Sequence, residues 1–255
     1  MKATRLSAAV PEAGVPLPAE LTARLRAAAN LEERGERPVG GSIALLSEAG
    51  LLADDGGTDP VRIARGLMQV GAANLSIGRL WEGHVNALRL IRLHGSAALQ
   101  RDVDRWIAGG ALLGVWGADG RVPVTLDASG AHLDGCKRFA SGLGTVSHAL
   151  VTVGSASEVR LALVDVTDQG RADPSGWDMQ GMRATASGGY DFCGLRVQDI
   201  RWVGGPGVYL QEPHFVGGVW RIAALQAGAA IGLLDEAAGS FAPWAGCRPS
   251  RNRLD

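Results

Sequence analysis

Cysteine is scarce in this chain and neither sign of charge predominates. Its three cysteines, Cys136, Cys193 and Cys247, lie far apart without CxxC spacing, which fits a reducing cytoplasm better than a disulfide scaffold. The 25 basic and 26 acidic side chains give a formal net charge of -1. Nucleic acids and anionic lipids need clustered positive charge on their partners, so we expect the protein to bind neither.

Long hydrophobic runs are missing as well. The N-terminus has no apolar run of signal-peptide length. The most apolar stretch, Ile222 to Leu234, contains Gln226 and is too short to span a bilayer. Hydrophobic residues still make up 46% of the chain, enough for a globular core. These features predict a cytoplasmic protein without a membrane span.

Motifs of several common enzyme classes are absent too. The sequence contains no HExxH zinc motif, no P-loop and no GxSxG nucleophile elbow. His84 and His94 would lie on different faces of one helix, so we expect no metal site.

The first 110 residues carry helical signals. Asp59 and Pro60 form a helix-start pair, and Ser96 is a predicted cap for a helix that ends at Gly109 and Gly110. Apolar residues recur at spacings of three and four. The predicted helices lie at 16–34, 42–52, 61–93 with a break around 73–76, and 96–106.

From residue 111, short β-prone runs alternate with Gly, Asp and Ser clusters, a pattern typical of an antiparallel barrel or sandwich. The predicted strands lie at 112–116, 132–140, 148–154, 159–166, 189–197 and 200–204. We therefore predict an α+β fold in three parts. These are an N-terminal helical domain (1–110), a middle antiparallel β-barrel or sandwich domain (111–210), and the first helix of an incomplete C-terminal helical domain with an irregular tail (211–255).

That last helix is predicted over 215–238, weakened by Gly228, Gly232 and Gly239. Nothing after it in the sequence offers a partner surface for its apolar residues. We therefore expect a truncated or disordered tail, and self-association through an exposed apolar stripe.

Three segments, in this order, resemble the acyl-CoA dehydrogenase family of flavoproteins. LSIGRLWEGHVNALRLIRLHG (75–95) is similar to a substrate-side helix of the family. DGCKRFASGLGTVSHAL (134–150) is similar to its G-x-K-x-[WF]-[IA]-[ST] strand and the following loop, and GWDMQGMRATASGGYD (176–191) to its G-M-R-[AG]-T-x-S strand. The resemblance covers roughly residues 40 to 240. It implies bound FAD, an acyl-CoA or similar small substrate, an unspecified electron acceptor, and a homodimer or homotetramer.

The resemblance also implies a flavin wall. The family's aromatic and hydroxyl positions against the isoalloxazine ring are here Phe139 and Ser141, with Ala140 between them; an aromatic and a hydrogen-bonding group suit the ring and its polar edge. The family's first flavin strand corresponds to GVWGADG (114–120), which departs from the usual Thr-Glu-Pro and Gly-Ser-Asp signature. Its candidates for flavin contact are Val115, Trp116 and Gly117.

On the substrate side, the resemblance implies Arg183 and Thr185 in the pocket wall and Arg221 near the start of the last helix. His84 is the polar residue that a monooxygenase on this scaffold would place near the flavin. Structural roles stay open for three of these: Arg183 pairing with an acidic neighbour, Thr185 filling a strand, and His84 packing in the core.

No catalytic residue is assigned. The family's glutamate removes the α-proton of an acyl thioester while hydride leaves the β-carbon for the flavin. At the start of the last helix its position is taken by Trp220, and Glu212 upstream is more suited to capping. Three hypotheses stay open: a dehydrogenase-type oxidoreductase, a flavin-dependent monooxygenase on the same scaffold, and a non-catalytic remnant or interaction module.

Overall fold

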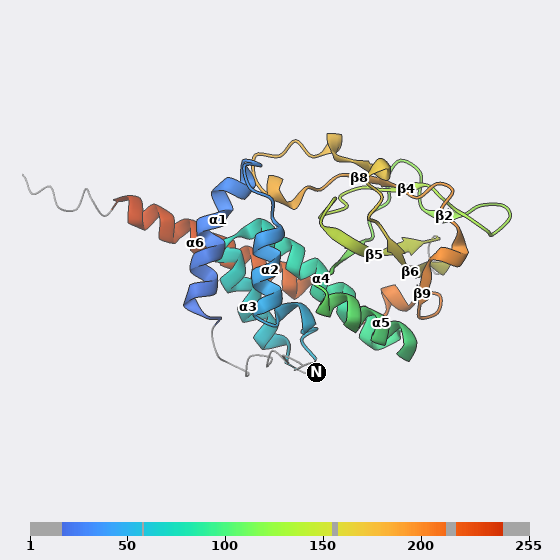
Figure 1. Cartoon of the computed structure of the whole chain (residues 1–255), viewed down its shortest axis with the longest axis horizontal. Helices are drawn as coiled ribbons and strands as arrows, with labels where there is room; N and C mark the ends of the chain where they lie inside the picture. The colour runs from blue at the N-terminus through green and yellow to red at the C-terminus, as the bar shows by residue number, and fades with distance from the viewer. Residues whose placement is uncertain (1–16, 58, 155–157, 213–217, 242–255) are drawn as a thin grey trace, which may run out of the picture.

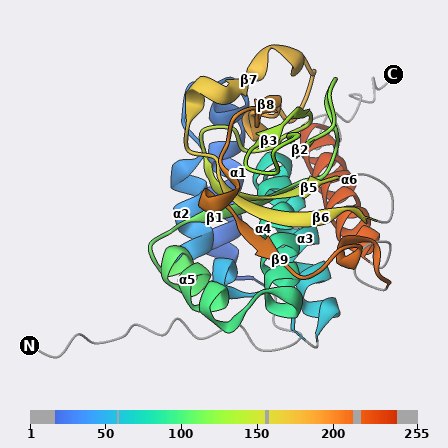
Figure 2. The same cartoon turned by 90° about the vertical axis from the view of Figure 1, so that its right-hand side faces the viewer.

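The computed structural model describes residues 17–57, 59–154, 158–212 and 218–241. Helices fill the first part of the chain and short strands the second, and the two groups lie side by side (Figure 1). The first five helices are α1 (Ala19–Glu33), α2 (Gly40–Glu48), α3 (Pro60–Ala73), α4 (Leu75–His94) and α5 (Ala97–Ala108). A last helix, α6 (Val219–Phe241), returns to pack along α3 (Figure 2).

Side-chain caps place the helix boundaries where the sequence predicts them. The Asp59 carboxylate accepts a hydrogen bond from the Arg62 amide at 3.1 Å, and Pro60 opens α3. Asn74 adopts an extended conformation between α3 and α4, and its side chain accepts from the Ile77 amide at 3.1 Å. The predicted break near 73–76 is therefore confirmed, because Asn74 both ends one helix and caps the next.

The main sheet is mixed, which corrects the predicted antiparallel barrel or sandwich at one strand pair. Its strand order is β1-β5-β6-β9. The β1 strand pairs with β5 in parallel, whereas β5–β6 and β6–β9 are antiparallel. A parallel pair needs a long crossover, which residues 117–145 provide. The four strands are Leu112–Trp116, Val146–Val153, Arg160–Asp165 and Arg201–Val203.

Two smaller sheets lie within this crossover and beyond β6, and no strand among the described residues closes them into a barrel. The predicted strand at 132–140 is divided at Gly135, whose φ of 97° favours glycine. The predicted strand at 189–197 ends at Asp191. The smaller sheets pair β2 (Thr125–Leu126) with β3 (Leu133–Asp134), and β4 (Cys136–Lys137) with β8 (Gly189–Asp191) and β7 (Ala172–Asp173).

Two glycines of α6, Gly228 and Gly232, are contact points, which corrects the prediction that they weaken this helix. A Cβ atom at Gly228 or Gly232 would overlap the backbone of Met68 or Ala72 on α3. The partner surface of α6 is thus supplied by an earlier helix. Positions 215–217 and the predicted irregular tail at 242–255 lie outside the described residues.

One hydrophobic core joins the helices to the main sheet. Buried residues of α4, among them Trp81 and Leu88, belong to the same cluster as Leu113 of β1 and Leu150 of β5. Because α4 packs directly on β1, its remaining polar face is held beside the end of that strand. The predicted domain boundaries near 110 and 210 remain predictions. No helix within the described ranges is long and apolar enough to cross a membrane.

Candidate functional site

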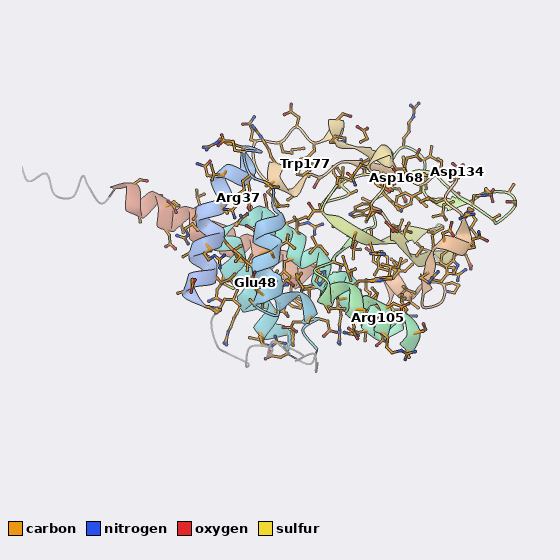
Figure 3. The ribbon with its side chains drawn as sticks, in the orientation of Figure 1. Arg37, Glu48, Arg105, Asp134, Asp168 and Trp177 are labelled. Atoms are coloured by element: carbon orange, nitrogen blue, oxygen red, sulfur yellow. The ribbon has the colours of Figure 1, made fainter. Side chains whose placement is uncertain are left out.

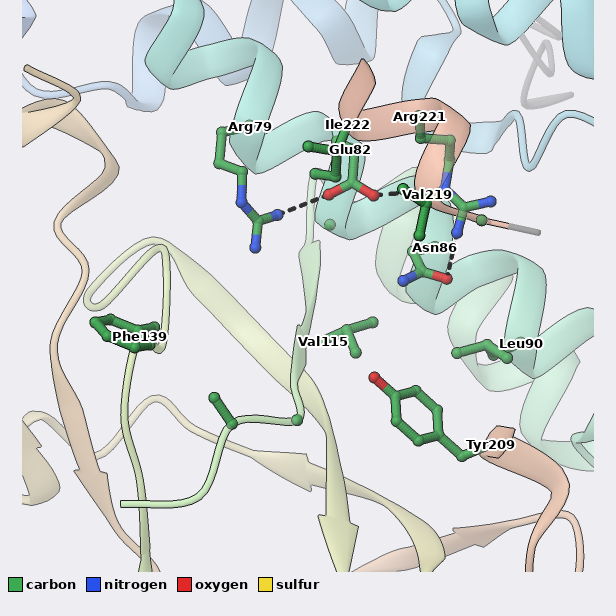
Figure 4. Close-up of a pocket in the computed structure, with 14 residues that line it drawn as sticks. Arg79, Glu82, Asn86, Leu90, Val115, Phe139, Tyr209, Val219, Arg221 and Ile222 are labelled. Atoms are coloured by element: carbon green, nitrogen blue, oxygen red, sulfur yellow. Dashed lines mark hydrogen bonds and ion pairs between the residues drawn. The ribbon is translucent and has the colours of Figure 1, made fainter. Parts of the chain in front are cut away.

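A pocket of about 410 Å³ opens where α4, the end of β1 and the beginning of α6 meet (Figure 4). Polar side chains from α4 and α6 line one side, and apolar groups, including Val115 and Ile222, line the others. The size is within the usual range for small-molecule and cofactor sites. The 3-10 turn η7 (Val208–Leu210) brings Tyr209 to the opposite wall.

The polar side of the pocket is a network around the buried carboxylate of Glu82. Arg79 Nη1 donates to one oxygen at 2.8 Å, and Arg221 Nε donates to the other at 3.4 Å. Arg221 also donates from Nη2 to Asn86 Oδ1 at 2.8 Å. Residues 79, 82 and 86 share one face of α4 because they are three and four positions apart. Burial lowers the pKa of Arg221, and the Glu82 carboxylate opposes that shift.

Tyr209 directs its hydroxyl into the pocket (Figure 4). A Cβ atom at position 117 would lie 2.9 Å from this oxygen, so glycine there lets the phenol approach the end of β1. Burial, together with the nearby Glu82 charge, raises the pKa of Tyr209. Tyr209 is therefore a neutral phenol near neutral pH, with its hydroxyl at the pocket wall.

Phe139 forms an exposed aromatic wall of the pocket. Its side chain is 49% exposed, and its φ of 54° places it in the left-handed region. Such a conformation costs a bulky residue about 1–3 kcal/mol and is found preferentially at functional sites. The turn is held because the next amide, of Ala140, donates to Gly188 O at 2.9 Å. The Arg138 guanidinium lies 5.0 Å from the ring centroid.

The predicted flavin-wall residues divide into two groups. Val115, Gly117 and Phe139 line the pocket. Trp116 and Ala140 are buried, and Trp116 Nε1 donates to the Ser141 carbonyl at 3.0 Å. The Ser141 hydroxyl accepts from Ser187 Oγ at 2.9 Å and borders a narrow crevice beside the pocket. Trp116 and Ala140 therefore support the wall from behind, and the half-buried Ser141 lies beside the pocket rather than in its lining.

The predicted substrate residues divide in the same way. Arg221 lines the pocket, but His84 is fully buried. Its Nε2 lies 2.7 Å from Leu52 O, and its Nδ1 accepts from the Leu113 amide at 2.9 Å. Burial lowers the pKa of His84 to about 4. This histidine therefore joins α4 to β1 in its neutral form and offers no surface to a substrate.

The segment with Arg183 and Thr185 is a 3-10 turn, η5 (Arg183–Thr185), so the predicted strand is wrong here. Left-handed residues, Met182 and Ala186, flank it and prevent an extended path. The Arg183 and Ala184 amides donate to the Glu33 carboxylate at 2.6 and 3.1 Å. Thr185 is buried and bonds to Met182 O at 2.7 Å. Neither predicted residue lines the main pocket.

Four polar residues of the pocket were not singled out from the sequence: Arg79, Glu82, Asn86 and Tyr209. The three on α4 carry a usable signal, since they form a polar stripe at helical spacing in a helix whose other positions are largely buried and apolar. Tyr209 carries none, because only the three-dimensional fold brings η7 to the end of β1.

No protein-family model matches the chain, and neither does any curated protein sequence. Solved structures do match. The complex of TdsC from Paenibacillus sp. A11-2 with FMN and indole has a TM-score of 0.66 at 24% identity, covering 86% of this chain and 62% of TdsC. KijD3, in complex with FMN and a dTDP-linked amino-keto sugar, has a TM-score of 0.65 at 20% identity over 92% of this chain and 64% of KijD3.

Methanesulfinate monooxygenase MsuC from Pseudomonas fluorescens has a TM-score of 0.66 at 20% identity, covering 94% of this chain and 66% of MsuC. The chain spans less than two thirds of the length of TdsC. The similarity establishes the arrangement of helices and strands, so this chain shares the fold of TdsC, KijD3 and MsuC.

Proposed function

We propose that this chain forms the flavin- and substrate-binding part of a flavin-dependent monooxygenase. The observation that carries the proposal is the pocket walled by the exposed Phe139 ring, in a fold shared with proteins solved with FMN. FMN is the cofactor we propose first, in place of the FAD that the family resemblance implies. TdsC is itself a dibenzothiophene monooxygenase.

The residues present suit a flavin. A half-exposed aromatic ring on a strained turn offers a flat surface for stacking. Gly83 and Gly117 leave the pocket floor open, where Cβ atoms would lie 3.2 Å from Arg79 Nη1 and 2.9 Å from the Tyr209 hydroxyl. A bound reduced flavin would supply the electrons with which molecular oxygen is activated. The side chains that line the pocket hold the substrate and exclude water.

Oxygenation suits this pocket better than α,β-dehydrogenation of an acyl thioester. Dehydrogenation requires a carboxylate that removes the α-proton. Among the described lining residues, Glu82 is the sole carboxylate, and both of its oxygens already accept hydrogen bonds from arginines. Trp220 occupies the position where the resemblance would place a glutamate. Reduction of the flavin by an acyl-CoA is therefore the competing outcome of the test.

The test begins with the purified chain, incubated separately with FMN and FAD and then freed of excess cofactor. We expect a retained visible flavin band, stronger with FMN. The Phe139→Ala variant should lose it, while Leu126→Ala, which removes another exposed hydrophobic side chain (41% exposed) outside the pocket, should retain it. A colourless wild-type protein would overturn the proposal.

A second step separates the two reactions. The bound flavin is reduced and exposed to oxygen with indole or benzoate, and products are analysed for added oxygen. An oxygenated product supports the monooxygenase. Bleaching of the oxidised flavin by butyryl-CoA without oxygen would favour a dehydrogenase instead.

A further inference from the structure

A second cavity, of about 240 Å³, adjoins the pocket described above. The two share four lining residues, Asn86, Leu90, Gly218 and Arg221. Arg221 therefore stands at the junction, with its guanidinium turned towards α4 (Figure 4). We call the two cavities together the double pocket. It extends along α4 from Arg79 to Arg89.

Charge in the double pocket is unbalanced. The charged groups among its described lining residues are three guanidiniums and two carboxylates. Arg89 is paired with Asp55 at 3.2 Å, whereas Arg79 and Arg221 share Glu82. One positive charge is thus left over on the shared cluster. The Arg221 side chain is only 9% exposed, so bulk water compensates that charge poorly.

The local backbone is shaped to keep Arg221 in this position. The guanidinium folds back against Gly218, where a Cβ atom would overlap it. Asn86 fixes Nη2, and Glu82 fixes Nε. These two bonds hold the planar guanidinium rigidly in a buried position, and a guanidinium so held suits a carboxylate or another oxyanion.

We propose that the double pocket binds a substrate that carries a single negative charge on a small organic body, with the charge at the Arg79–Arg221 cluster and the body against Leu90, Val115 and Ile222. This inference rests on the proposed function, because it names the substrate class of the same site. A monoanion would neutralise the cluster, and the apolar walls would bind the uncharged part.

The experiment compares benzoate with its neutral isostere benzamide, each titrated calorimetrically into the FMN-loaded chain and into the flavin-free chain. We expect benzoate to bind at least about tenfold more tightly, since hydrogen bonds to charged groups are the stronger ones. Added salt should weaken only benzoate. Equal affinities, or no binding of either probe, would overturn the inference.

Variants locate the charge. Arg79→Gln should weaken benzoate about tenfold and leave benzamide within about twofold. Glu82→Gln should act in the opposite direction and tighten benzoate, because the positive charge in excess grows. The control is Arg105→Gln on α5, a side chain that points outward at the edge of the molecule (Figure 3). Thermal unfolding of each variant establishes that it is folded. If neither Arg79→Gln nor Glu82→Gln changes the affinity for benzoate, the charge does not bind at the Arg79–Arg221 cluster and the proposal is contradicted.

Two further titrations, with formate and with FMN, test whether the cluster binds some other anion instead. If formate matches benzoate, the cluster is a site for any small anion and the inference fails. If benzoate and FMN exclude each other, the guanidiniums hold the flavin phosphate, and the inference fails as well.

Flavin binding is measured separately, from the visible absorption band of the bound cofactor. A colourless chain that prefers benzoate would overturn the monooxygenase and leave the anion site standing, whereas a yellow chain without that preference would do the reverse.

Discussion

Gly228 of α6 lies so close to Met68 of α3 that a Cβ atom at position 228 would overlap the Met68 carbonyl oxygen. The contact is between backbones, which cannot move aside as a flexible side chain can. Together with Gly232 against Ala72, it fixes how deeply α6 sits on α3, and hence where Arg221 enters the pocket.

Replacing Gly228 with alanine should therefore destabilise the protein. Alanine normally favours a helix by about 0.5–1 kcal/mol over glycine, but forced separation of the two helices should outweigh this gain, at about 1–3 kcal/mol. Gly239 has no atom within 4 Å of its Cβ position, so Gly239→Ala should stabilise slightly. Urea unfolding of both variants measures the difference, and equal effects would contradict the close contact.

The buried His84 predicts a loss of stability in mild acid. Its pKa falls from 6.5 in the unfolded chain to about 4 in the folded protein, so between these values the unfolded chain binds more protons. The stabilisation that neutral His84 gives the folded protein is fully present above pH 6.5. It is lost as the pH falls towards 4, which lowers the free energy of unfolding by up to about 3 kcal/mol.

Across that range the free energy of unfolding should decrease as the pH is lowered. The decrease should be less steep for His84→Gln. Burial also lowers the pKa of His148, so part of the slope should remain in the variant. An unchanged slope in His84→Gln would show that this histidine is not buried in its neutral form.

Glu33 is expected to hold the η5 turn in place. Glu33→Ala removes the acceptor of the Arg183 and Ala184 amides, at a cost of about 1–3 kcal/mol for bonds to a charged group. Hydrogen exchange at these two amides should accelerate. Glu36→Ala, which breaks only the exposed pair with Arg34, should leave their exchange unchanged.

The outer face of α6 should drive self-association. Ile231, Leu233 and Leu234 are 44%, 73% and 68% exposed, which is unusual for neighbouring apolar side chains on one helix. We expect sedimentation to detect dimers or larger species, and the double substitution Leu233→Glu with Leu234→Glu to favour the monomer. Leu126→Glu, on β2, is the control. A wild-type protein that sediments as a monomer would contradict this prediction.

Local signals account for what the sequence predicted well. Asp59 with Pro60, Asn74 and Ser96 act within a few residues of themselves, so the boundaries of α3, α4 and α5 follow from them. The run at 112–116 is β1 with the predicted bounds. The direction in which β1 pairs with β5 is set by the crossover between them, and no short-range pattern encodes it.

The site was predicted only in part for the same reason. Val115, Gly117, Phe139 and Arg221 line the pocket, and they follow from motif positions. His84, Trp116 and Ala140 belong to the same motifs but turn into the core. Motif order identifies a segment, whereas the face on which a side chain emerges depends on its packing. Gly228 and Gly232 of α6 illustrate this. Glycine has a low helix propensity, yet the close contact with α3 requires glycine at both positions.

The pairing of Glu82 with Arg221 joins residues 139 positions apart in the chain, and Glu33 reaches the Arg183 amide across 150. Contacts between residues so far apart in sequence form late, because the entropy cost of closing a large loop comes before the favourable energy of the contact. During synthesis, α4 and β1 leave the ribosome long before the start of α6. Until Arg221 follows, Glu82 has only one of its two arginine partners. The pocket between α4 and α6 is therefore incomplete until the start of α6 has been synthesised.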